Sequence, residues 1–156
     1  MTIRKATEKD IPRLIDLLYQ VHRTHSNGRP DIFRVGNKKY TEAELRDILA
    51  NDQTPIFAAV DENDVLYGYA FCIYEEIKNQ ISLTDRKSLY IDDLCVDEAM
   101  RGRHIGTDLY RYVLDRAKEN GCYHVTLNVW CLNEPAMRFY EKCGLSPLKI
   151  TMEQIL

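Results

Sequence analysis

The spacing of apolar residues predicts helices in the N-terminal third of the chain. Residues 2–5 predict a short strand, and a helix follows with Asp10 as its cap and Pro12 in its first turn, where a missing N–H does no harm. A second short helix is predicted after Thr41, which can form a capping box with Glu44. The apolar face of the first helix contains Ile11, Leu14, Ile15, Leu18 and Val21.

The intervening and following segments have other patterns. Residues 26–40 are polar and predict a loop, with one helical turn around 31–34. Alternating apolar residues then predict strands over 56–60, 65–74 and 88–96, the first two joined as a hairpin. Gly68 inside the second of these strands indicates a bulge or a close backbone approach. Residues 75–87 are polar and fit either a longer hairpin or a loop.

Helical spacing returns after Gly106 and ends at Gly121. A strand is predicted over 123–131, then a helix from Asn133 to Gly144, and closing strands over 145–156. The order of elements predicts one mixed α/β (α+β) domain over residues 1–156. Its sheet would be mostly antiparallel, and the late strand–helix–strand unit would supply a parallel pair.

Composition narrows the classes of function. The 156 residues carry a net charge of -3, which argues against a nucleic-acid partner. No apolar run approaches the roughly 20 residues that span a bilayer, and the first residues contain no signal-peptide core, so we expect a cytoplasmic protein without a membrane partner. Five cysteines without a Cys-x-x-Cys pair argue against a disulfide framework or a metal site.

Residues 94–110, LCVDEAMRGRHIGTDLY, are the most informative about chemistry. A strand leads into a glycine-containing loop that opens a helix, and free amides at a helix start bind anions. Gly102 and Gly106 permit close approach, and Arg101 and Arg103 can add charge-assisted contacts. The glycine pattern is neither a dinucleotide fingerprint nor a phosphate loop with Gly-Lys-Ser/Thr. By itself the segment fits an anion site and an ordinary tight turn equally well.

The same segment resembles the coenzyme A pyrophosphate loop of the GNAT acetyltransferase superfamily, Gln/Arg-x-x-Gly-x-Gly/Ala. Arg101 and Gly106 match its first and last positions, and His104 replaces the middle glycine. Histidine tolerates positive φ better than most residues other than glycine. A second stretch, residues 127–145, resembles the family signature Asn-x-x-Ala-x-x-Phe-Tyr-x-x-x-Gly-Phe/Leu. The matching positions are Asn133, Ala136, Phe139, Tyr140 and Gly144.

The resemblance implies a splayed parallel strand pair and acetyl-coenzyme A as co-substrate. The backbone of Leu94, Cys95 and Val96 would pair with the pantetheine arm. Asn133 would hydrogen-bond the pantetheine region, although it also fits a helix cap. The pyrophosphate would be held by amides of Arg101, Gly102, Arg103, His104, Ile105, Gly106 and Thr107.

Two catalytic residues follow from the resemblance. Tyr140 would protonate the departing thiolate, since a phenol with a pKa near 10 keeps its proton at pH 7; otherwise it is an aromatic core residue. The run YIDDLCV resembles an acidic strand of polyamine-type members, in which a carboxylate at the Asp92 position assists deprotonation. Strand alternation would put Asp92 and Asp93 on opposite faces, and we favour Asp92 as the base. Both carboxylates also fit ordinary paired or solvated positions.

The sequence says least about the cleft that would bind the acceptor amine. Asp93, Glu75 and Glu76 would border it and attract cationic amines, although a surface charge run explains the glutamates equally well. The loop over residues 29–34 lies where family members build acceptor specificity, and Phe33 would wall the site or fill the core.

The implied reaction is transfer of an acetyl group from acetyl-coenzyme A to a primary amine by direct attack in a ternary complex. Direct attack is implied because no cysteine matches a nucleophile position of the family. The acceptor would be a small polyamine-like molecule or a peptide or protein amine, and since nothing in the sequence selects among amines, an aminoglycoside or an amino acid fits as well. Two alternatives are a non-catalytic coenzyme A-binding or sensing domain and a nucleotide-phosphate binder. Homodimers are common among such relatives.

Overall fold

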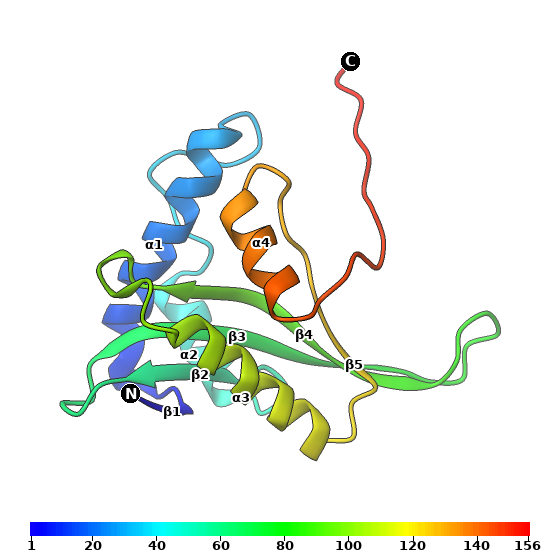
Figure 1. The fold of residues 1–156 in the computed structure, drawn as a ribbon, viewed down its shortest axis with the longest axis horizontal. Coiled ribbons are helices and arrows are strands. Elements are labelled where there is room, and N and C mark those ends of the chain that lie inside the picture. The colour runs from blue at the N-terminus through cyan, green and yellow to red at the C-terminus, as the bar shows by residue number, and fades with distance from the viewer.

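The computed structural model describes all 156 residues and contains a single sheet. Its strands are β1 Thr2–Lys5, β2 Ile56–Val60, β3 Leu66–Ile77, β4 Arg86–Val96 and β5 His124–Leu127. They lie in chain order, β1 to β4 antiparallel and β5 parallel to β4 (Figure 1). This mixed, mostly antiparallel sheet confirms the predicted fold class.

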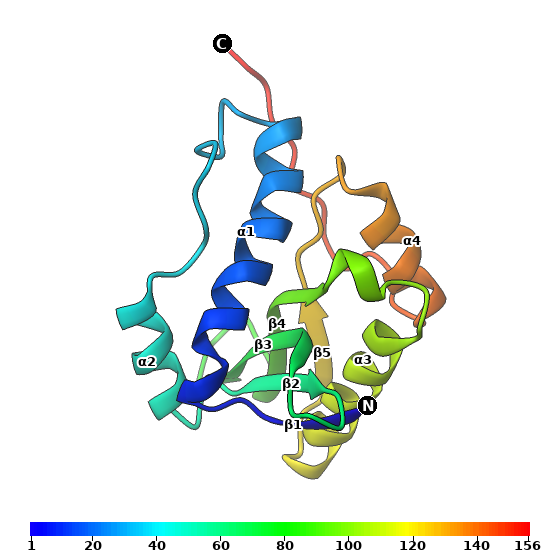
Figure 2. The same cartoon turned by 90° about the vertical axis from the view of Figure 1, so that its left-hand side faces the viewer.

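Four helices cover the two faces of the sheet. They are α1 Ile11–Gly28, α2 Glu42–Ala50, α3 Ile105–Glu119 and α4 Glu134–Lys142. α1 and α2 lie on one face, and α3 and α4 lie on the other (Figure 2). Short 3-10 turns at Glu8–Asp10 and Glu98–Met100 come before α1 and α3. No helix is long and apolar enough to cross a bilayer.

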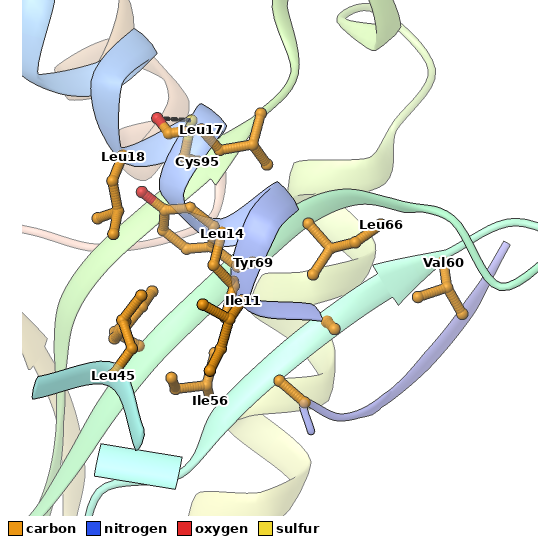
Figure 3. Packing of buried hydrophobic residues seen from close by; sticks show 13 residues of the cluster. Ile11, Leu14, Leu17, Leu18, Leu45, Ile56, Val60, Leu66, Tyr69 and Cys95 are labelled. Atoms are coloured by element: carbon orange, nitrogen blue, oxygen red, sulfur yellow. Dashed lines mark hydrogen bonds between the residues drawn. The ribbon is translucent and has the colours of Figure 1, made fainter. Parts of the chain in front are cut away.

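The core beneath α1 is built from the residues whose spacing predicted that helix. Leu14 and Leu18 are fully buried, together with Leu17, and they pack on Leu66 and Tyr69 of β3 (Figure 3). Burying one such side chain stabilises the fold by about 1.5–3 kcal/mol. α2 begins with the predicted capping box, in which the Glu44 amide donates to Thr41 Oγ1 at 3.2 Å.

Strands β3 and β4 decide between the two interpretations of residues 75–87, a longer hairpin or a loop. β3 continues to Ile77 and β4 begins at Arg86, so the polar segment extends the hairpin and only residues 78–85 form its loop. Gly68 fulfils the predicted close approach, because a Cβ there would lie 3.1 Å from the Cys95 carbonyl oxygen and 3.1 Å from Leu109. The β2–β3 register also shifts beside it.

Two predicted strands differ from the structure. The strand expected over 123–131 ends at Leu127, and residues 128–131 leave the sheet. The closing strands expected over 145–156 are wrong, since this segment forms no strand. Apolar alternation specifies a strand only where a neighbouring strand accepts its hydrogen bonds, and none within this chain does.

The start of α1 depends on Asp10 in a way other than predicted. Its carboxylate does not cap α1. Instead it accepts hydrogen bonds from Arg4 at 2.8 and 2.9 Å and from the Thr7 amide at 2.8 Å. Burial opposes ionisation, but Arg4 and Thr7 outweigh it and lower the pKa of Asp10. The ionised carboxylate therefore joins β1 to α1.

We expect Asp10→Asn to lower the free energy of unfolding at pH 7 by about 2 kcal/mol, the usual cost of losing hydrogen bonds to a buried charge. Because the folded-state pKa of Asp10 is lowered, its stabilisation is present above pH about 4 and is lost as the pH falls further. Urea denaturation at pH 7 and pH 3 measures this. A difference between the two proteins that is as large at pH 3 would contradict the assignment.

Candidate active site

β4 loses its β5 partner halfway along its length. The parallel pairing runs from Ser88 opposite His124 to Ile91 opposite Leu127, while β4 continues to Val96. Residues 93–96 are therefore paired with β3 alone, and no strand pairs with their other edge (Figure 1). This is the splayed pair that was expected, and Leu94, Cys95 and Val96 lie on it.

The loop after β4 leaves a row of main-chain amides unused. The first backbone bond of α3 is donated by Asp108 to His104, and none of the amides of residues 101–107 donates a hydrogen bond within the chain. Gly102 and His104 have φ of +78° and +61°, so histidine adopts the left-handed conformation there. The loop is anchored at its start, where Arg13 binds Asp97 at 2.6 Å.

Gly106 brings the two motif segments together. A Cβ on Gly106 would lie 3.3 Å from the ring of Phe139 and 3.6 Å from Val96. The start of α3 therefore lies close against α4, and a side chain at this position would require the Phe139 ring to shift by a few tenths of an ångström. Asn133 caps α4, accepting a hydrogen bond from the Ala136 amide at 3.3 Å, so the predicted capping role is present.

A bulge in β4 overturns the expected alternation of Asp92 and Asp93. Phe71 pairs with Asp93 and Cys72 pairs with Ile91, so Asp92 is the extra residue. Both carboxylates consequently face the α1–α2 side: Asp92 contacts Tyr40, and Asp93 contacts Tyr69. The prediction that they lie on opposite faces is wrong, because an inserted residue shifts the side-chain period by one.

Asp92 is already engaged. Lys39 Nζ lies 2.8 Å from Asp92 Oδ1 and 3.1 Å from the Asp92 carbonyl oxygen, and Tyr40 donates its hydroxyl to the other carboxylate oxygen. Burial, followed by this carboxylate, raises the pKa of Tyr40. The ammonium of Lys39 is thus already bound to Asp92, where the free edge of β4 begins.

Asp93 has the perturbed carboxyl group. It accepts a hydrogen bond from Tyr69 Oη at 2.9 Å and makes no ion pair. Desolvation by burial raises its pKa from 3.8 to about 6, against the smaller opposing effects of Tyr69 and Lys39. Such a carboxylate is ionised at pH 7 yet is basic enough to accept a proton.

Tyr140 of α4 lies close enough to this carboxylate to respond to its charge. Burial raises the pKa of Tyr140, and the charge of Asp93 raises it further, so the phenol is protonated at neutral pH. Burial also raises the pKa of the Cys95 thiol to about 12; its Sγ lies 3.8 Å from the Leu17 carbonyl oxygen (Figure 3). Cys95 is therefore a thiol at pH 7 and a poor nucleophile.

Phe33 belongs to an aromatic cluster at the far end of α1. Its ring centroid lies 5.1 Å from that of His25 and 4.9 Å from that of Trp130, and His22 approaches it at 5.8 Å. The cluster joins α1, the loop after it and the segment that leaves β5. Phe33 lies outside both buried clusters, so it does not fill the core, and its role as a wall of the acceptor site stays a prediction.

The two glutamates predicted to border the acceptor cleft have different surroundings. Glu75 is exposed on the same face as Tyr90, and its charge contributes to raising the pKa of Tyr90, after burial and Asp92. Glu76 pairs with Lys78 at 2.8 Å on the hairpin. No sequence pattern pointed to Trp130, Lys39 or Tyr40, because only long-range packing brings them to the site.

The model of the Acetyltransferase (GNAT) family matches residues 18–145. This chain belongs to the GNAT acetyltransferase family. Glucosamine 6-phosphate N-acetyltransferase of Arabidopsis thaliana is 37% identical over 68 residues, covering 44% of each chain. An uncharacterized N-acetyltransferase of Methanocaldococcus jannaschii is 26% identical over 149 residues, covering 96% of this chain. These matches span 44% and 62% of the two relatives' own lengths.

A solved structure matches the GNAT chain throughout. The crystal structure of a mutant BH1408 protein from Bacillus halodurans has a TM-score of 0.96 and 30% identity, and it covers 100% of this chain and 99% of the other. An aminoglycoside N-acetyltransferase in complex with coenzyme A shares the fold, with a TM-score of 0.73 and 14% identity.

We expect Asp93→Asn to stabilise the protein by about 1 to 2 kcal/mol at pH 8, less than the full pKa shift implies because the side chain is partly exposed. The folded-state pKa is raised, so the wild type loses stability as the pH rises from about 4 through 6, and the variant does not. At about pH 3, below the ordinary carboxyl pKa, the two should differ little. Urea denaturation across this range measures the effect, and a pH-independent difference would refute the raised pKa.

Proposed function

We propose that this GNAT protein transfers an acetyl group from acetyl-coenzyme A to a cationic primary amine by direct attack in a ternary complex. The observation that carries the proposal is the row of unused amides over residues 101–107 at the start of α3. Such amides, with the helix dipole behind them, suit a diphosphate, and Arg101 and Arg103 supply charge beside them.

The free edge of β4 supports the rest of the donor site. The peptide groups of residues 93–96 that face away from β3 suit an amide-rich arm such as pantetheine, which would add beside Leu94, Cys95 and Val96 as a strand does. Asn133, at the start of α4, would contact the same arm while it caps the helix.

Asp93 is the better candidate for the base, in place of the Asp92 favoured by the sequence. An alkyl ammonium with a pKa near 10.4 must lose a proton before its nitrogen attacks the thioester carbon. Asp93, with its pKa of about 6, can accept that proton directly or through water. The C–N bond forms, the C–S bond breaks, and the departing thiolate takes its proton from Tyr140.

Asp92 is proposed to bind the acceptor. The Lys39 ammonium already pairs with its carboxylate and its carbonyl oxygen, so the position is suited to a primary ammonium. An incoming amine would replace Lys39 there, and Glu75 and the Phe33–Trp130 cluster would lie further out. Two similar proteins are named for amino-sugar substrates, glucosamine 6-phosphate and aminoglycosides, and amino sugars therefore belong in the first substrate panel with polyamines and peptides.

Thiol release from acetyl-coenzyme A across these amine classes tests the reaction. With the best amine, Tyr140→Phe should lower kcat by about 100-fold, as loss of a general acid does, while the affinity for coenzyme A stays unchanged. Coenzyme A affinity is measured by calorimetry in both proteins. Cofactor binding without turnover on any amine would instead favour a non-catalytic sensing domain, and an unchanged kcat in the variant would refute the role of Tyr140.

Lys39→Met tests the acceptor position. Removing the competing ammonium should lower KM for the amine by about fivefold with little change in kcat. Lys38→Met is the matched control, because it removes the same charge one residue away, where the side chain contacts Tyr19 instead. Equal effects of the two variants, or a higher KM in Lys39→Met, would contradict the replacement of Lys39 by substrate.

A further inference from the structure

Lys39 brings a primary amine of this chain to the place proposed for the acceptor. It lies in the loop before α2, and its Nζ is 2.8 Å from Asp92 Oδ1 and 3.1 Å from the Asp92 carbonyl oxygen. Among the lysines in ion pairs, only Lys39 reaches the strand that borders the proposed donor site. The others bind carboxylates outside β4; they are Lys5, Lys9, Lys78 and Lys118.

The ammonium of Lys39 is also close to the carboxylate proposed as the base. Its charge helps to lower the pKa of Asp93 against the larger effect of burial, so the two groups are near one another. The pantetheine arm is proposed to lie beside Leu94, which is two residues beyond Asp92, about 7 Å along a strand. The thioester ends that arm, so a swing of the Lys39 side chain can bring Nζ from Asp92 toward it.

The side chain of Lys39 is free to make this movement. It is 41% exposed, and ion pairs in contact with water are weak. Its four-carbon stem is flexible, and its nitrogen becomes a nucleophile once it loses a proton. Lys38 offers the comparison: its Nζ lies 3.3 Å from Tyr19 Oη and 4.9 Å from the Tyr19 ring centroid, and Tyr19 is exposed on α1. Two adjacent lysines therefore differ in their access to the site.

We propose that Lys39 is a self-acetylation site: when no acceptor amine is present, its Nζ attacks the thioester of acetyl-coenzyme A bound to the same molecule. The inference rests on the proposed function, because it uses the same donor site. The bond from Nζ to the acetyl carbon forms and the C–S bond breaks. The ammonium gives up two protons, one to water through Asp93 and one in exchange for the proton that Tyr140 donates to the thiolate. The products are an acetyl-lysine at position 39, free coenzyme A and a proton.

Acetylation changes the acceptor site as well as Lys39. The amide nitrogen that forms carries no charge, so the ion pair with Asp92 is lost. The Asp92 carboxylate then becomes free for an acceptor ammonium, and Asp93 loses one of the influences that lower its pKa. A single self-acetylation thus converts a site occupied by the chain's own amine into one open to substrate.

The test is site mapping by mass spectrometry after the wild type is incubated with isotope-labelled acetyl-coenzyme A and no added amine. The label should appear on Lys39 about tenfold faster than on Lys38, because a reaction within one molecule has its groups already in place. The rate per molecule should be independent of protein concentration. Tyr140→Phe should slow labelling of Lys39 by about 100-fold and leave that of Lys38 unchanged. An unlabelled acetyl group on Lys39 of the purified wild type, and not of Tyr140→Phe, is the same result obtained during expression.

The outcomes separate this inference from the proposed function. Equal labelling of Lys38 and Lys39, or labelling of Lys39 that Tyr140→Phe does not slow, would indicate a spontaneous reaction and overturn the inference. Thiol release with an added amine, but no acetyl group on Lys39, would overturn the inference and leave the proposed function standing. Absence of both thiol release and labelling would overturn both.

A kinetic measurement checks the release of Asp92. Because an acceptor amine competes with Lys39 at Asp92, initial rates without preincubation describe the unmodified chain. Preincubation with acetyl-coenzyme A alone should lower KM for the amine by about fivefold, to the value of Lys39→Met. The same treatment should leave KM of Lys39→Met unchanged and should act on Lys38→Met as on the wild type. An unchanged or higher KM of the preincubated wild type would overturn the release of Asp92.

Discussion

Backbone N–H and C=O groups need hydrogen-bond partners, and along β4 this chain leaves some of them without a partner. After Ile91, β5 no longer follows β4, and the loop before α3 adds seven amides without partners, from Arg101 to Thr107. An unpaired peptide group is tolerated only in contact with water or with a ligand. The departure of β5 from β4 therefore creates a long polar strip, made of the free edge of β4 and the amides from Arg101 to Thr107, inside an otherwise well-packed domain. The arrangement of Gly106, Asn133 and Tyr140 depends on this strip.

The bulge at Asp92 gives this strip its chemistry. One extra residue places two carboxylates on the same face within a single strand, and their surroundings then make them different. Asp92 is held by Lys39 and Tyr40, whereas Asp93 has only the Tyr69 hydroxyl and a raised pKa of about 6. Two identical side chains thus become suited to separate tasks, one to bind a cation and one to exchange a proton.

Local signals in the sequence predicted much of this arrangement. Helical spacing located α1, the Thr41–Glu44 pair located the start of α2, and the motif around Gly106 located the loop with its left-handed His104. The Asp92–Asp93 orientation could not be predicted, because a bulge shifts the alternation and has no fixed sequence signature. The aromatic cluster around Phe33 was also missed, since Trp130 lies about a hundred residues further along the chain. The closing strands failed because alternation describes a segment and does not identify the edge that receives it.

Trp130 gives the cluster one more property. It is the only tryptophan in the chain, and its indole lies 4.9 Å from Phe33 and 6.4 Å from His25, on the segment that has just left β5. The fluorescence of the protein is therefore dominated by one fluorophore at the outer rim of the strip. Any movement of the loop after α1, or of residues 128–133, changes the surroundings of that indole, so the unlabelled chain carries its own optical reporter of events on this side of the sheet.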